Sequence, residues 1–176
     1  MITVEGSIEH IIYRNEENGY SVIEISDENG TLTLVGNLPP LSPGDLVRVE
    51  GNMVTHPTYG EQLQAVRCTL AAPRSVRAIE RYLASGVIKG IGPMLASRIV
   101  KLFQEDSLRI LEEDPRSLAK VPGISLKGAE KISAQALEKR ELRSALIYMD
   151  GLGIPLSLAT RIYERYGNAL YSVLQT

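Results

Sequence analysis

Residues 1–72 alternate hydrophobic and polar positions in short runs rich in β-branched side chains, a pattern typical of β-strands. Turn residues separate these runs. The Asn18-Gly19 and Asn29-Gly30 pairs accept the positive φ angles of tight hairpins, and residues 41–45 read as a broader turn. The expected strands are residues 2–13, 20–25, 31–35, 46–53 and 62–70.

Five short strands in about 70 residues predict a small closed β-barrel. The five-stranded oligonucleotide/oligosaccharide-binding (OB) barrel fits this number of strands, and the segment is too short for a larger barrel. We therefore expect residues 1–72 to form an OB-like β-barrel as the first domain.

After residue 73 the hydrophobic spacing becomes helical. Val76, Ile79 and Leu83 share one face of a first helix, and Pro93 suits the first position of a second one, where its missing N–H costs nothing. The other expected helices are a short one capped by Ser107, a short one opened by Asp114-Pro115, and segments 126–139, 141–149, 156–166 and 168–174, with a stop at Gly167. Residues 73–176 are therefore expected to form an all-α bundle as the second domain, which makes the fold class multidomain, β then α.

The helical half contains an internal repeat. The template Gly-Ile-x4-Ala-x2-Ile begins at Gly90, Gly123 and Gly153, and all four of its defined positions are kept each time. At average residue frequencies one match has a chance of roughly 10⁻⁴ per starting position, so three matches in about a hundred residues are not accidental. The repeat is the most specific signal in the sequence.

Each position of the repeat has a physical role. The glycine permits a tight turn, and the isoleucine after it anchors that turn in the core. The alanine and the second isoleucine share one face of the following helix, where the small alanine lets the preceding helix approach closely. The unit is therefore two helices joined by a short hairpin, and its helix N-terminus presents free backbone N–H groups that favour anions such as phosphate.

This unit resembles the helix-hairpin-helix motif, a DNA-binding element without sequence specificity that is found in repair and recombination proteins. In that family, hairpin amides contact phosphate oxygens and nearby Lys or Arg side chains strengthen the contact, which carries no sequence information. The resemblance implies two groups of DNA-binding residues. The first group is Lys89, Gly90, Ile91, Gly92, Arg98 and Lys101, and the second is Gly123, Ile124, Ser125, Lys127 and Lys131.

The three copies differ at the position after the hairpin isoleucine. Gly92 in the first copy matches the family best, and Ser125 in the second can cap the following helix. Pro155 in the third copy removes an amide donor that phosphate binding would use. We therefore expect the first copy to bind DNA and the third to be mainly structural, while both roles stay open for the second.

The charge distribution divides where the hydrophobic pattern changes. The whole chain has a formal net charge of −2, but residues 1–72 hold three basic and ten acidic side chains, and residues 73–176 hold sixteen basic and eleven acidic ones. This asymmetry favours a nucleic-acid partner for the helical half alone. The acidic barrel, whose aromatic residues are Tyr13, Tyr20 and Tyr59, lacks the positive stacking groove of a single-strand binder and is expected to contact proteins.

Patterns typical of catalysis and metal binding are lacking. Cys68 is the single cysteine and the two histidines are scattered, so the chain cannot form an internal disulfide or a cysteine-based zinc site. The sequence has no G-x4-G-K-S/T phosphate loop and no H-E-x-x-H motif. It also has no apolar run of membrane-spanning length. We expect a cytoplasmic chain that has no catalytic residues, metal or cofactor of its own and does not bind a membrane.

The order of the motifs resembles one helicase family. In chain order these motifs are Gly6-Ser7-Ile8-Glu9, Asn15-Glu16-Glu17-Asn18-Gly19-Tyr20, His56-Pro57-Thr58-Tyr59-Gly60, Tyr82 to Pro93, and Ile162-Tyr163-Glu164-Arg165-Tyr166-Gly167. Together they resemble the N-terminal region of the RecD-like ATP-dependent DNA helicases of superfamily 1 that act without RecB and RecC partners. The resemblance implies a 5′-to-3′ motor, with ATP and Mg as cofactors, in a C-terminal segment beyond these 176 residues, so we expect the chain to be a fragment of such a helicase.

The interpretation that follows is a monomeric accessory module. Its helical half holds the backbone of single-stranded or forked DNA near the motor domain of the same chain, and its acidic barrel contacts other proteins. Two alternatives stay open. A Holliday-junction-binding subunit resembling RuvA also joins an OB barrel to helix-hairpin-helix repeats but works as a tetramer, and a protein-interaction module without DNA affinity would use the repeats only as support.

Overall fold

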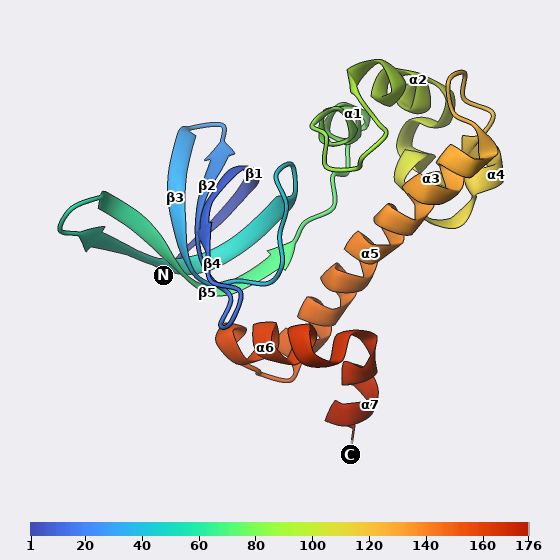
Figure 1. The fold of residues 1–176 in the computed structure, drawn as a ribbon. Helices are drawn as coiled ribbons and strands as arrows, with labels where there is room; N and C mark the ends of the chain where they lie inside the picture. Colours follow the sequence, from blue (N-terminus) through green and yellow to red (C-terminus); the bar gives the residue numbers. More distant parts are fainter. Residues whose placement is uncertain (176) are drawn as a thin grey trace. The chain divides into compact units, whose positions relative to one another are not determined.

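The structure is a computed structural model that describes residues 1–175 (Figure 1). Its strands are β1 (Ile2–Arg14), β2 (Tyr20–Asp27), β3 (Gly30–Asn37), β4 (Leu46–His56) and β5 (Gly60–Leu70). Its α-helices are α1 (Val76–Ala84), α2 (Pro93–Phe103), α3 (Ser107–Glu113), α4 (Pro115–Leu118), α5 (Leu126–Gly151), α6 (Leu156–Tyr166) and α7 (Leu170–Leu174).

The five strands form a closed barrel in the order β1-β2-β3-β5-β4. Strand β1 closes one side because it is long enough to pair antiparallel with both β4, through residues 2–7, and β2, through residues 7–14. A short parallel pairing of β3 with β5, at Leu34 and Leu63, closes the other side. The predicted fold class, an OB-like barrel followed by helices, is confirmed.

The barrel core follows from strand alternation. In β2 the inward positions Ser21, Ile23 and Ile25 are buried, and Leu34 of β3 and Leu63 of β5 are fully buried beside them. Strands β4 and β5 are longer than the sequence pattern predicts, and in Figure 1 their hairpin extends beyond the other strands.

The tip of the β4–β5 hairpin, residues 57–59, lies between the two strands expected at 46–53 and 62–70. His56 ends β4, and its Nδ1 accepts hydrogen bonds from the N–H groups of Thr58 and Tyr59, at 3.0 and 3.1 Å. The histidine therefore shapes the turn.

Two expectations for the helices are wrong. Segments 126–139 and 141–149 form the single helix α5, because neither glycine nor proline interrupts the chain between them. Ser107 is not the N-cap of α3 but its first residue, and its buried hydroxyl donates to the carbonyl oxygen of Gln104 at 2.7 Å. The predicted stop at Gly167 is confirmed, since this residue caps α6 with a positive φ of 52°.

The chain folds into two compact units whose division differs from the domain division at residues 72 and 73. Unit 1 combines the barrel residues 1–71 with residues 143–176, and unit 2 is residues 72–142. Helix α5 contributes to both, because it crosses residue 142. Unit 1 holds six basic and twelve acidic side chains, whereas unit 2 holds thirteen basic and nine acidic ones. The third repeat therefore folds with the acidic barrel rather than with the first two repeats.

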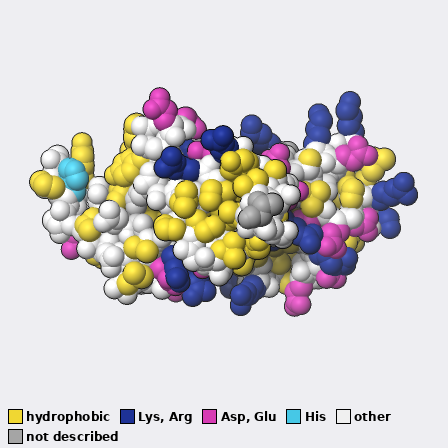
Figure 2. All heavy atoms as spheres, turned by 90° about the horizontal axis from the view of Figure 1, so that it is seen from below, with side chains coloured by type: hydrophobic (Ala, Val, Ile, Leu, Met, Phe, Trp, Pro, Cys, Tyr) yellow, Lys and Arg dark blue, Asp and Glu magenta, His cyan; other side chains and the backbone are white. Residues whose placement is uncertain are grey.

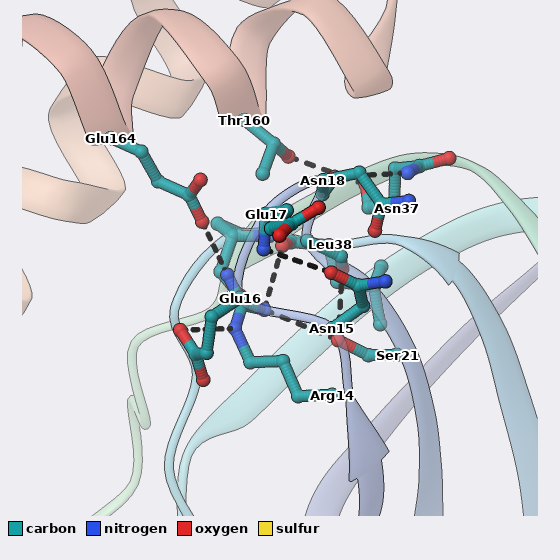
Figure 3. Close-up of polar contacts among 12 residues, drawn as sticks. Arg14, Asn15, Glu16, Glu17, Asn18, Ser21, Asn37, Leu38, Thr160 and Glu164 are labelled. Atoms are coloured by element: carbon teal, nitrogen blue, oxygen red, sulfur yellow. Dashed lines mark hydrogen bonds and ion pairs between the residues drawn. The ribbon is translucent and has the colours of Figure 1, made fainter.

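A largely buried arginine joins α6 to the barrel inside unit 1 (Figure 3). The Arg14 side chain is 12% exposed and donates to the carbonyl oxygens of Leu38 and Pro39, at 2.9 and 3.1 Å, and to the Ser21 hydroxyl. Its remaining terminal nitrogen, Nη2, pairs with the carboxylate of Glu164 on α6. Because the barrel bonds fix the guanidinium, α6 has one preferred position against the barrel.

Helix α6 also packs closely against the end of β3 and the turn between β1 and β2. Thr160 of α6 donates through Oγ1 to the carbonyl oxygen of Asn37 at 3.3 Å. Gly19 adopts a positive φ of 76°, and a Cβ at this position would lie 2.8 Å from Thr160 Cγ2. Gly19 is thus required both for the turn and for the close approach of α6. Gly19 belongs to the motif of residues 15–20 and Glu164 to the motif of residues 162–167, so each of these two motifs contributes one residue to the contacts between α6 and the barrel.

Replacing Gly51 by alanine should destabilise the barrel. A Cβ at Gly51 would lie 2.2 Å from the backbone oxygen of Gln64, so β4 or β5 has to shift. We expect Gly51→Ala to lower the free energy of unfolding by about 1–3 kcal/mol or more, measured by urea denaturation. Gly151→Ala at the end of α5 is the matched control, because a methyl group there meets nothing within 4 Å. Equal losses in the two variants would contradict this account of the barrel.

Removing the Arg14 side chain should cost more than removing an exposed arginine. Arg14→Met leaves the Glu164 carboxylate and two carbonyl groups without their donor, and we expect a loss of about 2–4 kcal/mol in urea denaturation. Arg67→Met is the control. The Arg67 side chain is 59% exposed and pairs with Glu50 and Asp150 at 3.5 and 3.3 Å, so its loss should stay below about 1 kcal/mol. A larger loss of stability in Arg67→Met than in Arg14→Met would contradict the proposed role of Arg14 in holding α6 against the barrel.

The thiol of Cys68 should report unfolding. Burial, helped by the charge of Asp45, raises the pKa of Cys68 from 9.0 to about 12. The buried, protonated thiol therefore contributes fully to the free energy of unfolding below pH 9.0. This contribution is lost as the pH rises toward 12, because the thiol ionises more readily in the unfolded chain. At pH 8 we expect Ellman's reagent to modify this cysteine only at the rate at which the barrel opens, with full reactivity in urea. Immediate labelling of the folded protein would refute this expectation.

Candidate nucleic-acid interface

The first repeat places a tight turn between α1 and α2. Gly90 adopts a φ of 101°, and Gly92 precedes α2 as its N-cap without a side-chain cap. The Ile91 side chain is 3% exposed and anchors the turn in the core, while its N–H group donates to the carbonyl oxygen of Ile88 at 3.3 Å. The predicted roles of the glycine and the isoleucine in the turn agree with this geometry.

The second repeat has the same arrangement between α4 and α5. Gly123 has a φ of 96°, and Ile124 is buried with its N–H group bonded to the carbonyl oxygen of Val121 at 3.1 Å. Ser125 caps α5, because its hydroxyl accepts the N–H of Gly128 at 3.0 Å. The second turn therefore repeats the first with a serine cap in place of a bare glycine.

Each of the two turns leaves two backbone N–H groups unoccupied. Within residues 1–175, no hydrogen bond engages the N–H groups of Gly90 and Gly92 in the first turn, or those of Gly123 and Ser125 in the second. All four residues are exposed. Ile91 and Ile124 were also predicted to contact DNA, but their N–H groups are hydrogen-bonded inside the turns. The donors that an anion can reach are therefore those of the glycines and Ser125, next to the N-termini of α2 and α5.

The first two repeats share one hydrophobic core in unit 2. The repeat residues Ala96 and Ile99 of α2 pack in the same buried cluster as Ala129 and Ile132 of α5. All four side chains are no more than 4% exposed. Both turns therefore belong to a single packed body.

Side chains from each repeat also hold the turn of the other. Gln135 of α5 accepts the Lys89 N–H through Oε1 at 2.8 Å and donates through Nε2 to the Lys89 carbonyl oxygen at 2.9 Å. Arg98 of α2 donates through Nη1 to the carbonyl oxygen of Pro122 at 3.0 Å. Gln135 was not among the residues predicted from sequence, since no motif position marks it. Arg98, predicted to contact DNA, uses at least one of its N–H groups on the second turn.

The predicted lysines are available at the surface. Lys89, Lys101, Lys127 and Lys131 are exposed, and none of them forms an ion pair within the part of the chain that the structure describes. In Figure 2, Lys and Arg side chains project from unit 2 at the right of the view. These four cationic side chains are therefore not held in ion pairs with carboxylates of the described residues.

A second group of cations lies on α1 and its N-terminal flank and was missed by the sequence reasoning. Arg74, Arg77 and Arg81 are exposed and free of ion pairs among the described residues. Arg77 and Arg81 are four residues apart in α1 and so lie on one side of the helix, a signal that the sequence itself contains, while Arg74 precedes the N-cap Ser75.

The third turn differs from the first two. Its Gly153 and Ile154 amides are hydrogen-bonded to the carbonyl oxygens of Asp150 and Met149, at 2.9 and 3.1 Å. Pro155, the N-cap of α6, has no N–H group. This turn lines a cavity of about 460 Å³ in unit 1, together with Arg48 and Arg67 of the barrel. Within residues 1–175 this turn therefore has no free N–H groups of the kind found in the other two turns, and the structural role expected for it stays a prediction.

Neither a metal centre nor a membrane span was found in the described part of the chain. Among residues 1–175, no three His, Cys, Asp or Glu side chains gather closely enough to hold a metal ion. None of the helices formed by these residues combines the length and the apolar character needed to cross a membrane.

Two comparisons with known proteins relate the chain to helicases. Residues 1–73 match the family model described as the OB-fold domain of the ATP-dependent DNA helicase YrrC. The chain is also 31% identical to the ATP-dependent RecD2 DNA helicase of Deinococcus radiodurans, over 93% of this chain and 24% of that relative. The chain thus spans about a quarter of the length of the relative. The resemblance to the OB-containing N-terminal region of RecD-like helicases is confirmed.

Proposed function

We propose that this chain is an accessory module of a RecD-like DNA helicase and that unit 2 binds the DNA backbone without reading its sequence. One observation carries the proposal. Two exposed turns in one packed body each present, beside a helix N-terminus, two N–H groups that no described residue occupies. Such groups are suited to phosphate oxygens, because the amides donate hydrogen bonds and the helix dipole favours negative charge.

The surrounding charge supports a polyanionic ligand. Lys89 adjoins the first turn and Lys127 the second, and neither is paired with a carboxylate in the described residues. Unit 2 has four more basic than acidic side chains, whereas unit 1 has six more acidic than basic ones. DNA is therefore expected to bind unit 2 and to be repelled by the barrel, which is left to contact other proteins.

The parent protein carries the motor in this proposal. The relative is an ATP-dependent DNA helicase, which favours a motor that uses ATP. The resemblance of the motifs to RecD-like helicases further implies Mg as a cofactor and movement from 5′ to 3′. In this proposal the motor lies in another segment of the same cytoplasmic protein, and the module described here holds single-stranded or forked DNA near it during repair or recombination.

Charge reversal at the two turns should abolish most DNA binding. We expect Lys89→Glu combined with Lys127→Glu to weaken binding of a fluorescent forked oligonucleotide more than tenfold in an anisotropy titration at low salt. The salt dependence of the binding constant should fall by about two phosphate contacts, because each lysine neutralises one phosphate. Arg161→Glu combined with Arg165→Glu in α6 is the control, since it makes the same charge change in unit 1.

Three results would count against the proposal. A wild-type chain without DNA affinity at low salt would favour a protein-interaction module. Equal losses of DNA affinity in the two double variants would mean that binding depends on the net charge of the chain and not on the two turns. A tetrameric mass in light scattering would favour a junction-binding subunit like RuvA, because the proposed module is a monomer.

A further inference from the structure

We infer that Gln135 and Arg98 are positioning residues that aim the free amides of the two turns at DNA. This inference rests on the proposed function of unit 2 and deepens it. It assigns a role to Gln135, which carries no charge and belongs to no motif, and it gives Arg98 a role different from the phosphate contact predicted from sequence.

The peptide plane before each turn glycine links a carbonyl group to the glycine N–H. A trans peptide holds its C=O and N–H groups in one plane and pointing in opposite directions. The carbonyl of Lys89 and the N–H of Gly90 belong to one such plane, and the carbonyl of Pro122 and the N–H of Gly123 belong to another. A side chain that holds the carbonyl therefore also directs the glycine N–H to the opposite side.

In the first turn Gln135 holds this plane. Its Nε2 donates to the Lys89 carbonyl oxygen at 2.9 Å, and its Oε1 accepts the Lys89 N–H at 2.8 Å. Two bonds to one residue fix both the amide side chain and the backbone. The Gly90 N–H consequently points away from α5 and is unoccupied within residues 1–175.

In the second turn Arg98 performs the same task. Its Nη1 donates to the Pro122 carbonyl oxygen at 3.0 Å, so the Gly123 N–H points away from the guanidinium. The contact is close, because a Cβ at Gly123 would lie 3.1 Å from Arg98 Nη1. Arg98 is a residue of α2, the helix after the first turn, and it holds the second turn. Gln135 is a residue of α5, the helix after the second turn, and it holds the first turn.

This reciprocal arrangement matters because glycine peptides rotate easily. Gly90 and Gly123 have φ angles of 101° and 96°, in a region where glycine moves at little steric cost. Without the side-chain bonds these planes would sample several orientations, and DNA binding would have to order them. Holding the planes in advance removes this entropy cost from binding.

Gln135→Met tests the inference without changing charge, since methionine has a similar length but cannot make either bond. We expect DNA binding to weaken about fivefold to tenfold, the effect of losing one or two hydrogen bonds that organise the turn. The slope of binding against salt should stay that of the wild type, because no phosphate contact is removed. In amide NMR spectra, hydrogen exchange at Lys89 should accelerate and the Gly90 resonance should shift.

Ser133→Ala is the matched control on the same helix. The Ser133 side chain is buried and its hydroxyl donates to the carbonyl oxygen of Glu112 at 3.4 Å, away from both turns. It should lower the melting temperature and leave DNA affinity unchanged. If Gln135 had only a structural role, Gln135→Met would likewise lower the melting temperature and leave DNA affinity unchanged. If Gln135→Met does not fold, Gln135→Asn provides the second variant, because its shorter side chain cannot span the distance to Lys89.

The outcomes separate this inference from the proposed function. If the wild type binds DNA and a folded Gln135 variant binds equally well, the inference is overturned and the proposed function stands. A lower salt slope in Gln135→Met would also overturn it, since that result would make Gln135 a direct contact. If the wild type does not bind DNA, the proposed function fails, and the inference built on it fails as well. This holds even if the Lys89 exchange data show that Gln135 is hydrogen-bonded to Lys89.

Discussion

The orientation of two peptide planes, one before Gly90 and one before Gly123, is the constraint on which the helical unit depends. Each plane is held by a side chain from the other repeat, and each leaves a glycine N–H group without a partner among residues 1–175. The isoleucine after each glycine is buried and prevents the turn from detaching from the core. The same short motif therefore builds the core and presents the donors, which explains why a repeat of four defined positions is sufficient to mark it.

The third repeat shows what becomes of the motif when these donors are removed. Pro155 lacks an N–H group, and the Gly153 and Ile154 amides are used inside the turn. Helix α6, which follows this turn, is joined to the barrel through Arg14 and Glu164 and folds with it as unit 1. The division of charge follows the division into units, so the repeats that keep free donors lie in the basic unit. A single motif thus serves two purposes, a surface for anions and a packing element for the barrel.

The sequence predicts the barrel and the repeats because both depend on local signals. Alternating strands, Asn-Gly turns and the glycine-isoleucine template can each be recognised within a few residues. Helix α5 was divided in error because its buried face changes: Ala136 and Leu142 are both buried, yet six residues do not return to the same side of a helix. The role of Gln135 could not be predicted, because its contact with Lys89 joins residues that are 46 positions apart and depends on how the two repeats pack.

The central claim is that the free turn amides are the surface that meets phosphate. The most direct measurement is an amide NMR titration of the ¹⁵N-labelled chain with duplex and forked DNA at low salt. The account predicts that the largest shifts occur at the N–H groups of Gly90, Gly92, Gly123 and Ser125, with little change at Gly153 and Ile154. Shifts confined to the barrel, or an unchanged spectrum at all four turn amides while DNA is bound, would contradict it.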